Sequence, residues 1–298
     1  MTANRRRVVT FSLSLALAAC AAIVCAQTAP EAQPSPQVGP QIAFPGQYAP
    51  TPTDWKYPAA PSACGRFAGD ERVACLEFVA FDFGRLSRFA AANAALAPAS
   101  AKEARVVFLG DSITDMWSLS DRSGPFFPGK PYVNRGIGGQ TTSQMLLRYR
   151  ADVIDLKPRV VVILAGTNDI AGRSGPMTLE MSESNLATMA DLARFHGIKV
   201  VFASLLPVCD DKTDAAGQPI VQTKVRPPES IKALNRCIAA YAQTHRHVYL
   251  DYFSAMARPD GTLNPDLTGD GVHPNAAGYA VMAPLAEKAI AEAISGAR

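Results

Sequence analysis

The segment VVFLGDSITDMW, residues 106–117, constrains the fold of this chain more than any other stretch. Its first four residues are β-branched, aromatic or aliphatic and run into Gly110, which predicts a strand buried on both faces. Asp111 and Ser112 follow, and a helix is expected over residues 112–119. A serine on the first turn of such a helix lies where backbone N–H groups and the helix dipole favour an anion. Two interpretations therefore stand at this point: a simple helix cap, or a nucleophile presented by Ser112.

A second apolar run, RVVVILA at residues 159–165, predicts a central parallel strand. Further strands and the intervening helices alternate along the chain, which predicts a parallel sheet covered by helices on both faces. The other expected strands are 132–134, 199–205 and 247–250, and the other expected helices are 141–155, 178–196, 229–244 and 275–294.

The N-terminal residues 1–26 are typical of an export signal, because three arginines precede the apolar stretch 8–24. Cleavage after Ala26, lipidation of Cys20 at a lipobox, and an uncleaved anchor remain as alternatives. Without these residues 26 basic side chains face 26 acidic ones, so charge does not indicate a nucleic-acid partner. Residues 27–61 hold nine prolines and predict an extended linker.

Residues 62–298 are the predicted folded domain, with one or two helices over residues 65–96 ahead of the first strand. Four cysteines remain after the signal, which permits two disulfides in an exported protein, although buried thiols are the alternative. The hypothesis pairs Cys64 with Cys75 and Cys209 with Cys237, since each pair brackets a local segment. No cysteine or histidine spacing indicates zinc.

Loops at the carboxyl ends of parallel strands meet at one edge of the sheet. Ser112, the glycine-rich turn 136–139 and Asn168 each follow a predicted strand, and Asp270 and His273 follow the last one. A serine needs a base, and the base needs an acceptor that fixes its tautomer. The other three histidines, His196, His245 and His247, lie at a helix end or at the opposite edge of the sheet. His273 is therefore the predicted base and Asp270 its partner, while the serine N–H, a glycine N–H and the Asn168 amide are the predicted oxyanion donors.

Four blocks in order, GDS at 110–112, NRGIGG at 134–139, GTND at 166–169 and DGVH at 270–273, resemble the SGNH or GDSL-type hydrolases over about residues 103–296. The resemblance implies Ser112 as nucleophile, Gly139 and Asn168 in the oxyanion hole, His273 as base and Asp270 as its orienting partner. The stretch GIGGQTT at residues 136–142 resembles the subgroup that includes platelet-activating-factor acetylhydrolase-like and carbohydrate acetylesterases. That subgroup often has an acidic residue where Gln140 stands.

We therefore expect an α/β protein with a three-layer α/β/α, flavodoxin-like domain of about five parallel strands. The expected function is an exported serine esterase for short-chain esters, including O-acetyl groups on carbohydrate, with no metal or organic cofactor. The alternatives are a lysophospholipase or thioesterase of the same fold, and a non-catalytic cell-envelope binding protein. Membrane attachment is expected only through lipid on Cys20, and the sequence predicts no oligomeric state.

The loop 207–228 bears on the substrate, because it is predicted to follow a strand at the same edge as Ser112. It is polar along its length and shows no apolar face of the kind that a lipase lid needs. Its polar residues are Asp210, Asp211, Lys212, Asp214, Gln218, Gln222, Lys224 and Arg226.

Overall fold

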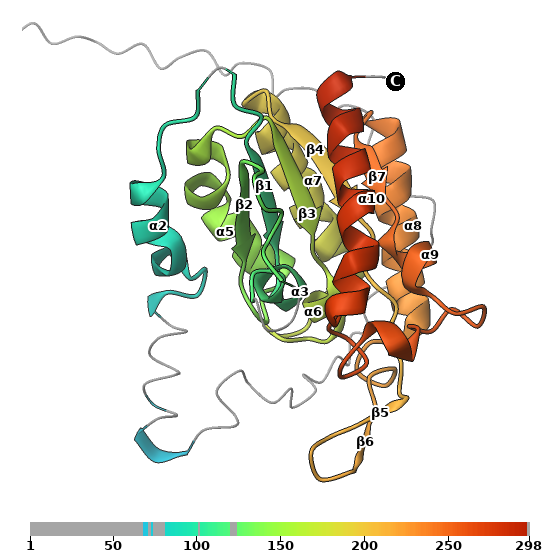
Figure 1. The fold of residues 1–298 in the computed structure, drawn as a ribbon. Coiled ribbons are helices and arrows are strands. Elements are labelled where there is room, and N and C mark those ends of the chain that lie inside the picture. Colours follow the sequence, from blue (N-terminus) through green and yellow to red (C-terminus); the bar gives the residue numbers. More distant parts are fainter. Residues whose placement is uncertain (1–67, 71–72, 74–80, 101, 120–123, 297–298) are drawn as a thin grey trace, which may run out of the picture. The chain divides into compact units, whose positions relative to one another are not determined.

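The computed structural model describes residues 68–70, 73, 81–100, 102–119 and 124–296 (Figure 1). The chain divides into two units, Met1–Ala43 and Phe44–Arg298, and the first lies wholly outside the described residues. The predicted signal, the proline-rich linker and the Cys64–Cys75 pair lie outside them as well. Within the described ranges, no helix has the length and hydropathy to cross a membrane.

Five parallel strands form one sheet, as predicted, and their order in the sheet is β2-β1-β3-β4-β7. Each strand is short and rich in β-branched residues, and β1 and β3 are buried along their whole length between neighbours on both sides. The strands are β1 (Val106–Gly110), β2 (Tyr132–Gly136), β3 (Val160–Leu164), β4 (Lys199–Ala203) and β7 (Val248–Leu250). The strand order changes direction between β1 and β3, which is where doubly wound α/β sheets bind their ligands.

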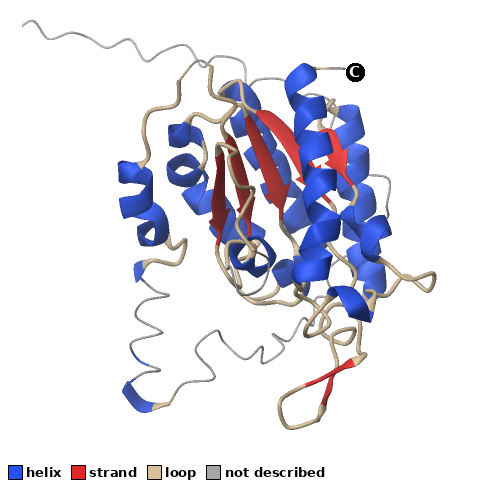
Figure 2. Cartoon of the chain, viewed as in Figure 1, coloured by secondary structure: helices blue, strands red, loops and turns tan. Residues whose placement is uncertain are grey.

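Helices cover both faces of this sheet (Figures 1 and 2). Alternate strand residues divide the core, because successive side chains of a strand point to opposite faces. Val107 and Leu109 of β1 pack with α5, α7 and α8, whereas Val106 and Phe108 pack with α3, α9 and α10. The helices are α3 (Ser112–Met116), α5 (Thr142–Asp152), α7 (Leu179–Phe195), α8 (Pro228–Thr244), α9 (Tyr252–Met256) and α10 (Ala276–Ser295).

The segment before β1 contains the 3₁₀ turn η1 (Leu86–Phe89) and the short helix α2 (Ala90–Ala95). A polar contact fixes it to α5, since Asn93 Nδ2 donates to Asp152 Oδ1 at 2.7 Å. Asp152 also pairs with the fully buried Arg148 at 3.0 Å. The N-terminal extension thus helps to satisfy a buried ion pair under the first strands.

Several short elements were not predicted. They are α6 (Thr167–Ile170), the 3₁₀ turns η2 (Ile154–Leu156) and η3 (Pro265–Leu267), helix α9, and a hairpin of β5 (Lys212–Thr213) and β6 (Pro219–Ile220). The hairpin lies within the predicted loop 207–228, and Asp214 closes its turn by accepting the N–H groups of Ala216 and Gln218. A strand of two residues is too short to show hydrophobic alternation, so the sequence pattern does not predict this hairpin. Its turn is stabilised by the hydrogen bonds of the Asp214 side chain.

The predicted Cys209–Cys237 disulfide is wrong. Both residues are buried, but neither is bonded to the other. Cys209 packs in the cluster on the α10 face of the sheet. Cys237 belongs to α8, beside Ile238, which packs on the opposite face. The two thiols lie on different sides of the sheet. Cys209 and Cys237 therefore form no disulfide, although both lie near the ends of the loop in sequence.

Helix α3 lies so close to β2 that a single methyl group added at Gly136 should strongly destabilise the fold. A Cβ on Gly136 would lie 2.1 Å from the backbone nitrogen of Asp115, so Gly136→Ala forces two backbone segments apart. We expect a loss of at least about 3 kcal/mol in the free energy of unfolding, measured by urea denaturation.

Gly269→Ala is the matched control, because its Cβ would meet no atom within 4 Å and its φ is not positive. It should change the free energy of unfolding by less than about 0.5 kcal/mol. Equal free energies of unfolding for the two variants would show that the backbones of α3 and β2 are not in close contact at Gly136.

Candidate active site

Four separate segments place the predicted site residues at the carboxyl edge of the sheet. Ser112 is the first residue of α3, directly after β1, and Asn168 lies in α6, directly after β3. The glycine turn follows β2, and His273 lies in the segment between η3 and α10. Asp111 caps α3, because its Oδ1 accepts the N–H of Ile113 at 2.9 Å. The cap interpretation therefore holds for Asp111 and leaves the hydroxyl of Ser112 available.

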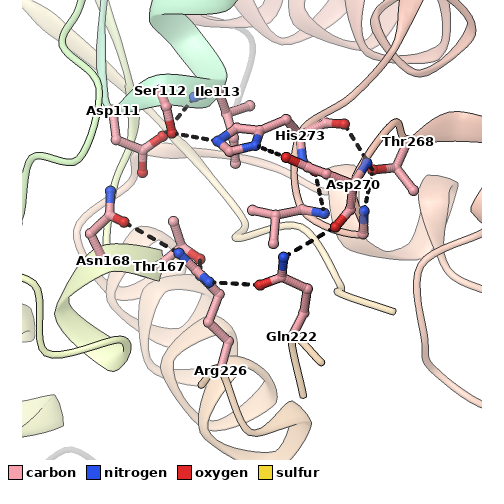
Figure 3. A network of polar contacts seen from close by, with 12 residues as sticks. Asp111, Ser112, Ile113, Thr167, Asn168, Gln222, Arg226, Thr268, Asp270 and His273 are labelled. Carbon is pink, nitrogen blue, oxygen red and sulfur yellow. Dashed lines mark hydrogen bonds and ion pairs between the residues drawn. The ribbon is translucent and has the colours of Figure 1, made fainter. Parts of the chain in front are cut away.

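Two hydrogen bonds connect Ser112, His273 and Asp270 (Figure 3). Ser112 Oγ lies 2.8 Å from His273 Nε2. The other ring nitrogen, Nδ1, lies 2.6 Å from Asp270 Oδ2. A carboxylate only accepts, so Nδ1 carries the proton in the neutral ring and Nε2 is left to accept the serine proton. This arrangement is what a serine nucleophile requires of its base.

The turn 270–273 is held independently of the ring. Thr268 Oγ1 donates to the carbonyl of His273 at 2.8 Å and accepts the N–H of Gly271 at 3.0 Å. Gly271 has φ +85°, and a Cβ there would lie 2.3 Å from the carbonyl oxygen of Cys209. Only glycine fits at this position, so the turn brings Asp270 and the His273 ring onto one side.

The two carboxylates beside Ser112 differ in their ionisation. Partial burial raises the pKa of Asp270, but hydrogen bonds from the ring and backbone of His273 outweigh it and hold that pKa well below the usual range. Burial raises the pKa of Asp111 to about 6, against the lowering effect of the Ile113 N–H and of the nearby His273 and Arg226. The buried Asp111 Oδ2 has no hydrogen-bond partner among the described residues. Asp270 is therefore the stable anion opposite His273.

The structure distinguishes the two adjacent glycines of the turn. The N–H of Gly138 donates to Asp115 Oδ2 at 3.1 Å, and a Cβ on this residue would lie 3.8 Å from Ser112 Cβ. Gly139 has φ +80°, and no group in the described part of the chain accepts its N–H. Among the described residues the N–H of Gly139 is therefore without an acceptor, whereas the N–H of Gly138 is bonded to Asp115.

The Asn168 amide is buried and faces the glycine turn, since its Nδ2 donates to the carbonyl of Gln140 at 3.1 Å. One amide hydrogen remains for another acceptor. Asp169 and Asn134 do not face this site. Asp169 accepts from the backbone and side chain of Thr142, and Asn134 donates to the carbonyl of Thr114 at 2.6 Å. These two side chains hold the loops in place.

The remaining histidines lie elsewhere. His196 ends α7, and His245 ends α8 with its ring stacked on Tyr241 at 4.0 Å. His247 precedes β7, at the amino end of that strand. Within the described ranges, no group of three or more His, Cys, Asp or Glu side chains is arranged to hold a metal ion.

One polar residue near the site was missed. Arg226 is 5% exposed, and its Nη2 lies 3.5 Å from Asn168 Oδ1 (Figure 3). In the sequence it is one of several charged residues in the loop 207–228, and no pattern distinguishes it from Lys224. Only the packing of that loop against α6 shows that Arg226 points inward.

Comparison with known proteins adds to this geometry. The model of the GDSL-like lipase/acylhydrolase family matches residues 108–281, which is more than half of the chain and includes every residue of the site. The chain belongs to the GDSL-like lipase/acylhydrolase family. The predictions of family, fold class and hydrolase activity are therefore confirmed.

Members of this family with similar sequences include a solved GDSL-like lipase from Bacteroides thetaiotaomicron. It is 40% identical with a TM-score of 0.64, over 71% of this chain and 99% of that one. Platelet-activating factor acetylhydrolase IB subunit alpha1 from Pongo abelii is 27% identical over 60% of this chain and 72% of its own length. Uncharacterized lipoprotein YqeF from Bacillus subtilis is 37% identical, over 26% of this chain and only 33% of its own length.

The raised pKa of Asp111 predicts a pH-dependent stability difference. Its folded pKa of about 6 lies above the unfolded value of about 3.9, so ionising it costs the folded state free energy above pH 6. The cost builds up between about pH 4 and pH 6, and at pH 3.5, where the carboxyl is mostly protonated in both states, it nearly vanishes. Asp111→Asn keeps the cap on Ile113 and removes the charge. It should raise the free energy of unfolding by about 2–3 kcal/mol at pH 8 and leave it unchanged at pH 3.5.

Asp266→Asn, at an exposed carboxylate outside the site, should change stability by less than about 0.5 kcal/mol at either pH. Urea denaturation at the two pH values measures both variants. A gain for Asp111→Asn that is equal at pH 3.5 and pH 8 would contradict the raised pKa.

Proposed function

We propose that this acylhydrolase is a serine esterase that works through Ser112, His273 and Asp270. The observation that carries the proposal is the pair of hydrogen bonds of 2.8 and 2.6 Å that runs from Ser112 Oγ through the His273 ring to Asp270. Ser112 Oγ attacks the ester carbonyl while His273 Nε2 takes its proton. The protonated ring is stabilised by Asp270 and then gives the proton to the leaving alcohol. Water, activated by the same nitrogen, hydrolyses the acyl-enzyme.

The oxyanion formed in each attack needs donors that are already in place. Three are proposed: the backbone N–H of Ser112 at the start of α3, the N–H of Gly139, and the Asn168 amide. The bond from Gly138 to Asp115 supports Gly139 rather than Gly138 in this role. The bond from Asn168 to the Gln140 carbonyl fixes the amide next to the turn.

The proposed substrate is an ester of a short acyl group, such as acetyl on a carbohydrate. The loop 207–228 extends over the site edge, where Gln222 donates to the carbonyl of Asp270 at 3.1 Å. Val221 and Val225 of this loop are exposed, and so are its charged residues Asp210, Asp211 and Lys224, which make the exposed side of the loop mixed rather than apolar. The acetylhydrolase name of the relatives from Pongo abelii and other mammals supports an acetyl group.

Export is proposed as well, on the strength of the basic and apolar pattern in residues 1–26. The lipoprotein name of the relative from Bacillus subtilis supports a protein of the cell envelope. The two processing routes, cleavage after Ala26 and lipidation of Cys20, both place the folded domain outside the cytoplasm.

Removal of the nucleophile tests the mechanism. Ser112→Ala should abolish hydrolysis of p-nitrophenyl acetate, because it removes the hydroxyl that forms the acyl-enzyme, while the melting temperature changes by no more than a few degrees. Asn168→Ala should lower kcat/KM by about 2–4 kcal/mol of transition-state stabilisation. Unaltered turnover in Ser112→Ala would refute the mechanism.

The acyl preference is tested with p-nitrophenyl esters of increasing chain length. We expect kcat/KM to fall steeply from acetyl and butyryl to octanoyl and longer esters, and acetate to be released from acetylated saccharides. Equal or better efficiency on dodecanoyl or palmitoyl esters would reject the short-chain proposal and indicate a lysophospholipase.

A further inference from the structure

Arg226 is a buried cation beside the proposed oxyanion donors. Its Nε donates to Thr167 Oγ1 at 3.1 Å and its Nη1 to Gln222 Oε1 at 3.1 Å. Its Nη2 faces Asn168 Oδ1 at 3.5 Å. No carboxylate of the described residues lies within ion-pair distance of its guanidinium. Burial of an arginine without a direct ion pair is costly, and the charges of the nearby Asp111 and Asp270 carboxylates offset part of that cost.

The contacts of Asn168 show what Arg226 does to the amide. An asparagine side chain has one oxygen that accepts and one nitrogen that donates, and its plane can turn over. The guanidinium only donates, and the Gln140 carbonyl on the other side only accepts. If the amide were reversed, its NH₂ group would face the donating guanidinium of Arg226, and its oxygen would face the carbonyl oxygen of Gln140. Figure 3 shows the amide oxygen turned toward Arg226 and the nitrogen turned toward Asp111 and Ser112.

The cation also acts on the strength of the amide as a donor. A full positive charge 3.5 Å from Oδ1 draws electron density toward the oxygen and makes the Nδ2 hydrogens more acidic. The guanidinium stays protonated across the pH range of esterase assays, so this effect is constant. Arg226 is held in place by Thr167 of α6 and by Gln222, whose amide in turn donates to the carbonyl of Asp270. The loop 207–228 thus connects the Asn168 side of the site with the His273 side.

From this geometry we propose that Arg226 is a positioning residue, which fixes the Asn168 amide with Nδ2 toward the oxyanion. This inference rests on the proposed esterase mechanism, and it adds to it a residue outside the four sequence blocks. Arg226 acts through Asn168 and touches no reacting atom. Its contribution therefore belongs to the transition state, in which the oxyanion exists, and not to binding of the uncharged ester.

A double-mutant cycle on the purified protein tests this, with p-nitrophenyl acetate as substrate. Loss of an oxyanion donor lowers kcat by about 100- to 1000-fold, so Asn168→Ala should fall in that range. Arg226→Met should lower kcat by about 10- to 100-fold and leave KM within about threefold. Combined with Asn168→Ala, it should cause no further loss beyond about threefold, because its effect passes through the same amide.

Arg226→Lys keeps the charge but lacks the planar fork that reaches Thr167 and Asn168 together, so its kcat should lie between those of wild type and Arg226→Met. If Arg226→Met does not fold, Arg226→Lys replaces it in the cycle. Arg159→Met is the matched control, because Arg159 is exposed and lies just before the amino end of β3. It should leave kcat and KM unchanged.

Losses that multiply in the double variant would overturn the inference, as would unchanged kcat in Arg226→Met or a loss that lies in KM. Ser112→Ala separates the two levels of the argument. If that variant remains active, the esterase mechanism itself is wrong. If it is inactive and the losses multiply, only the role of Arg226 is wrong.

Discussion

The candidate site depends on how closely helix α3 lies against the ends of β1 and β2. A Cβ on Gly110 would lie 2.0 Å from Thr114 Oγ1, and a Cβ on Gly136 would lie 2.1 Å from the backbone nitrogen of Asp115. Both positions must therefore be glycine for the first turn of α3 to sit over the sheet. This contact places Ser112 beside the glycine turn after β2 and lets Asp115 accept the Gly138 N–H. The positions of the nucleophile and of two of its proposed oxyanion donors therefore depend on this close packing.

Hydrogen bonding then distinguishes two kinds of polar group at the carboxyl edge of the sheet: those that hold the structure together and those that remain available to a substrate. Asp169, Asn134 and the buried Arg148 have partners that hold loops and helices together. Among the described residues, the N–H of the half-buried Gly139 has no acceptor, and the buried Asp111 Oδ2 has no hydrogen-bond partner. Buried polar groups without partners are rare, and each one in a folded protein needs an explanation. The difference between Asp270 and Asp111 follows the same rule, since hydrogen bonds to the carboxylate stabilise the anion and burial without them destabilises it.

The sequence predicted the sheet and the candidate residues because both rest on short, local patterns. The apolar runs around β1 and β3 end within one residue of the observed strands, and Ser112, Asn168 and His273 follow from the rule that strand ends converge. The helices α6 and α9 are too short for a hydrophobic period. Arg226 was missed because its role arises from a long loop that folds back on α6. Its contacts there, Thr167 and Asn168, lie 59 and 58 positions earlier in the sequence. The cysteine pairing failed for the same reason, since closeness in sequence does not determine the side of the sheet.

The central claim is that Ser112 attacks the substrate with His273 as its base. Covalent labelling with diethyl p-nitrophenyl phosphate tests it most directly, because a serine activated by its base forms a stable phosphoryl ester. We expect one diethylphosphoryl group per chain, located by peptide mass spectrometry at Ser112, and loss of labelling in His273→Ala. A label on another residue, or an unlabelled Ser112 in protein that still hydrolyses esters, would contradict it.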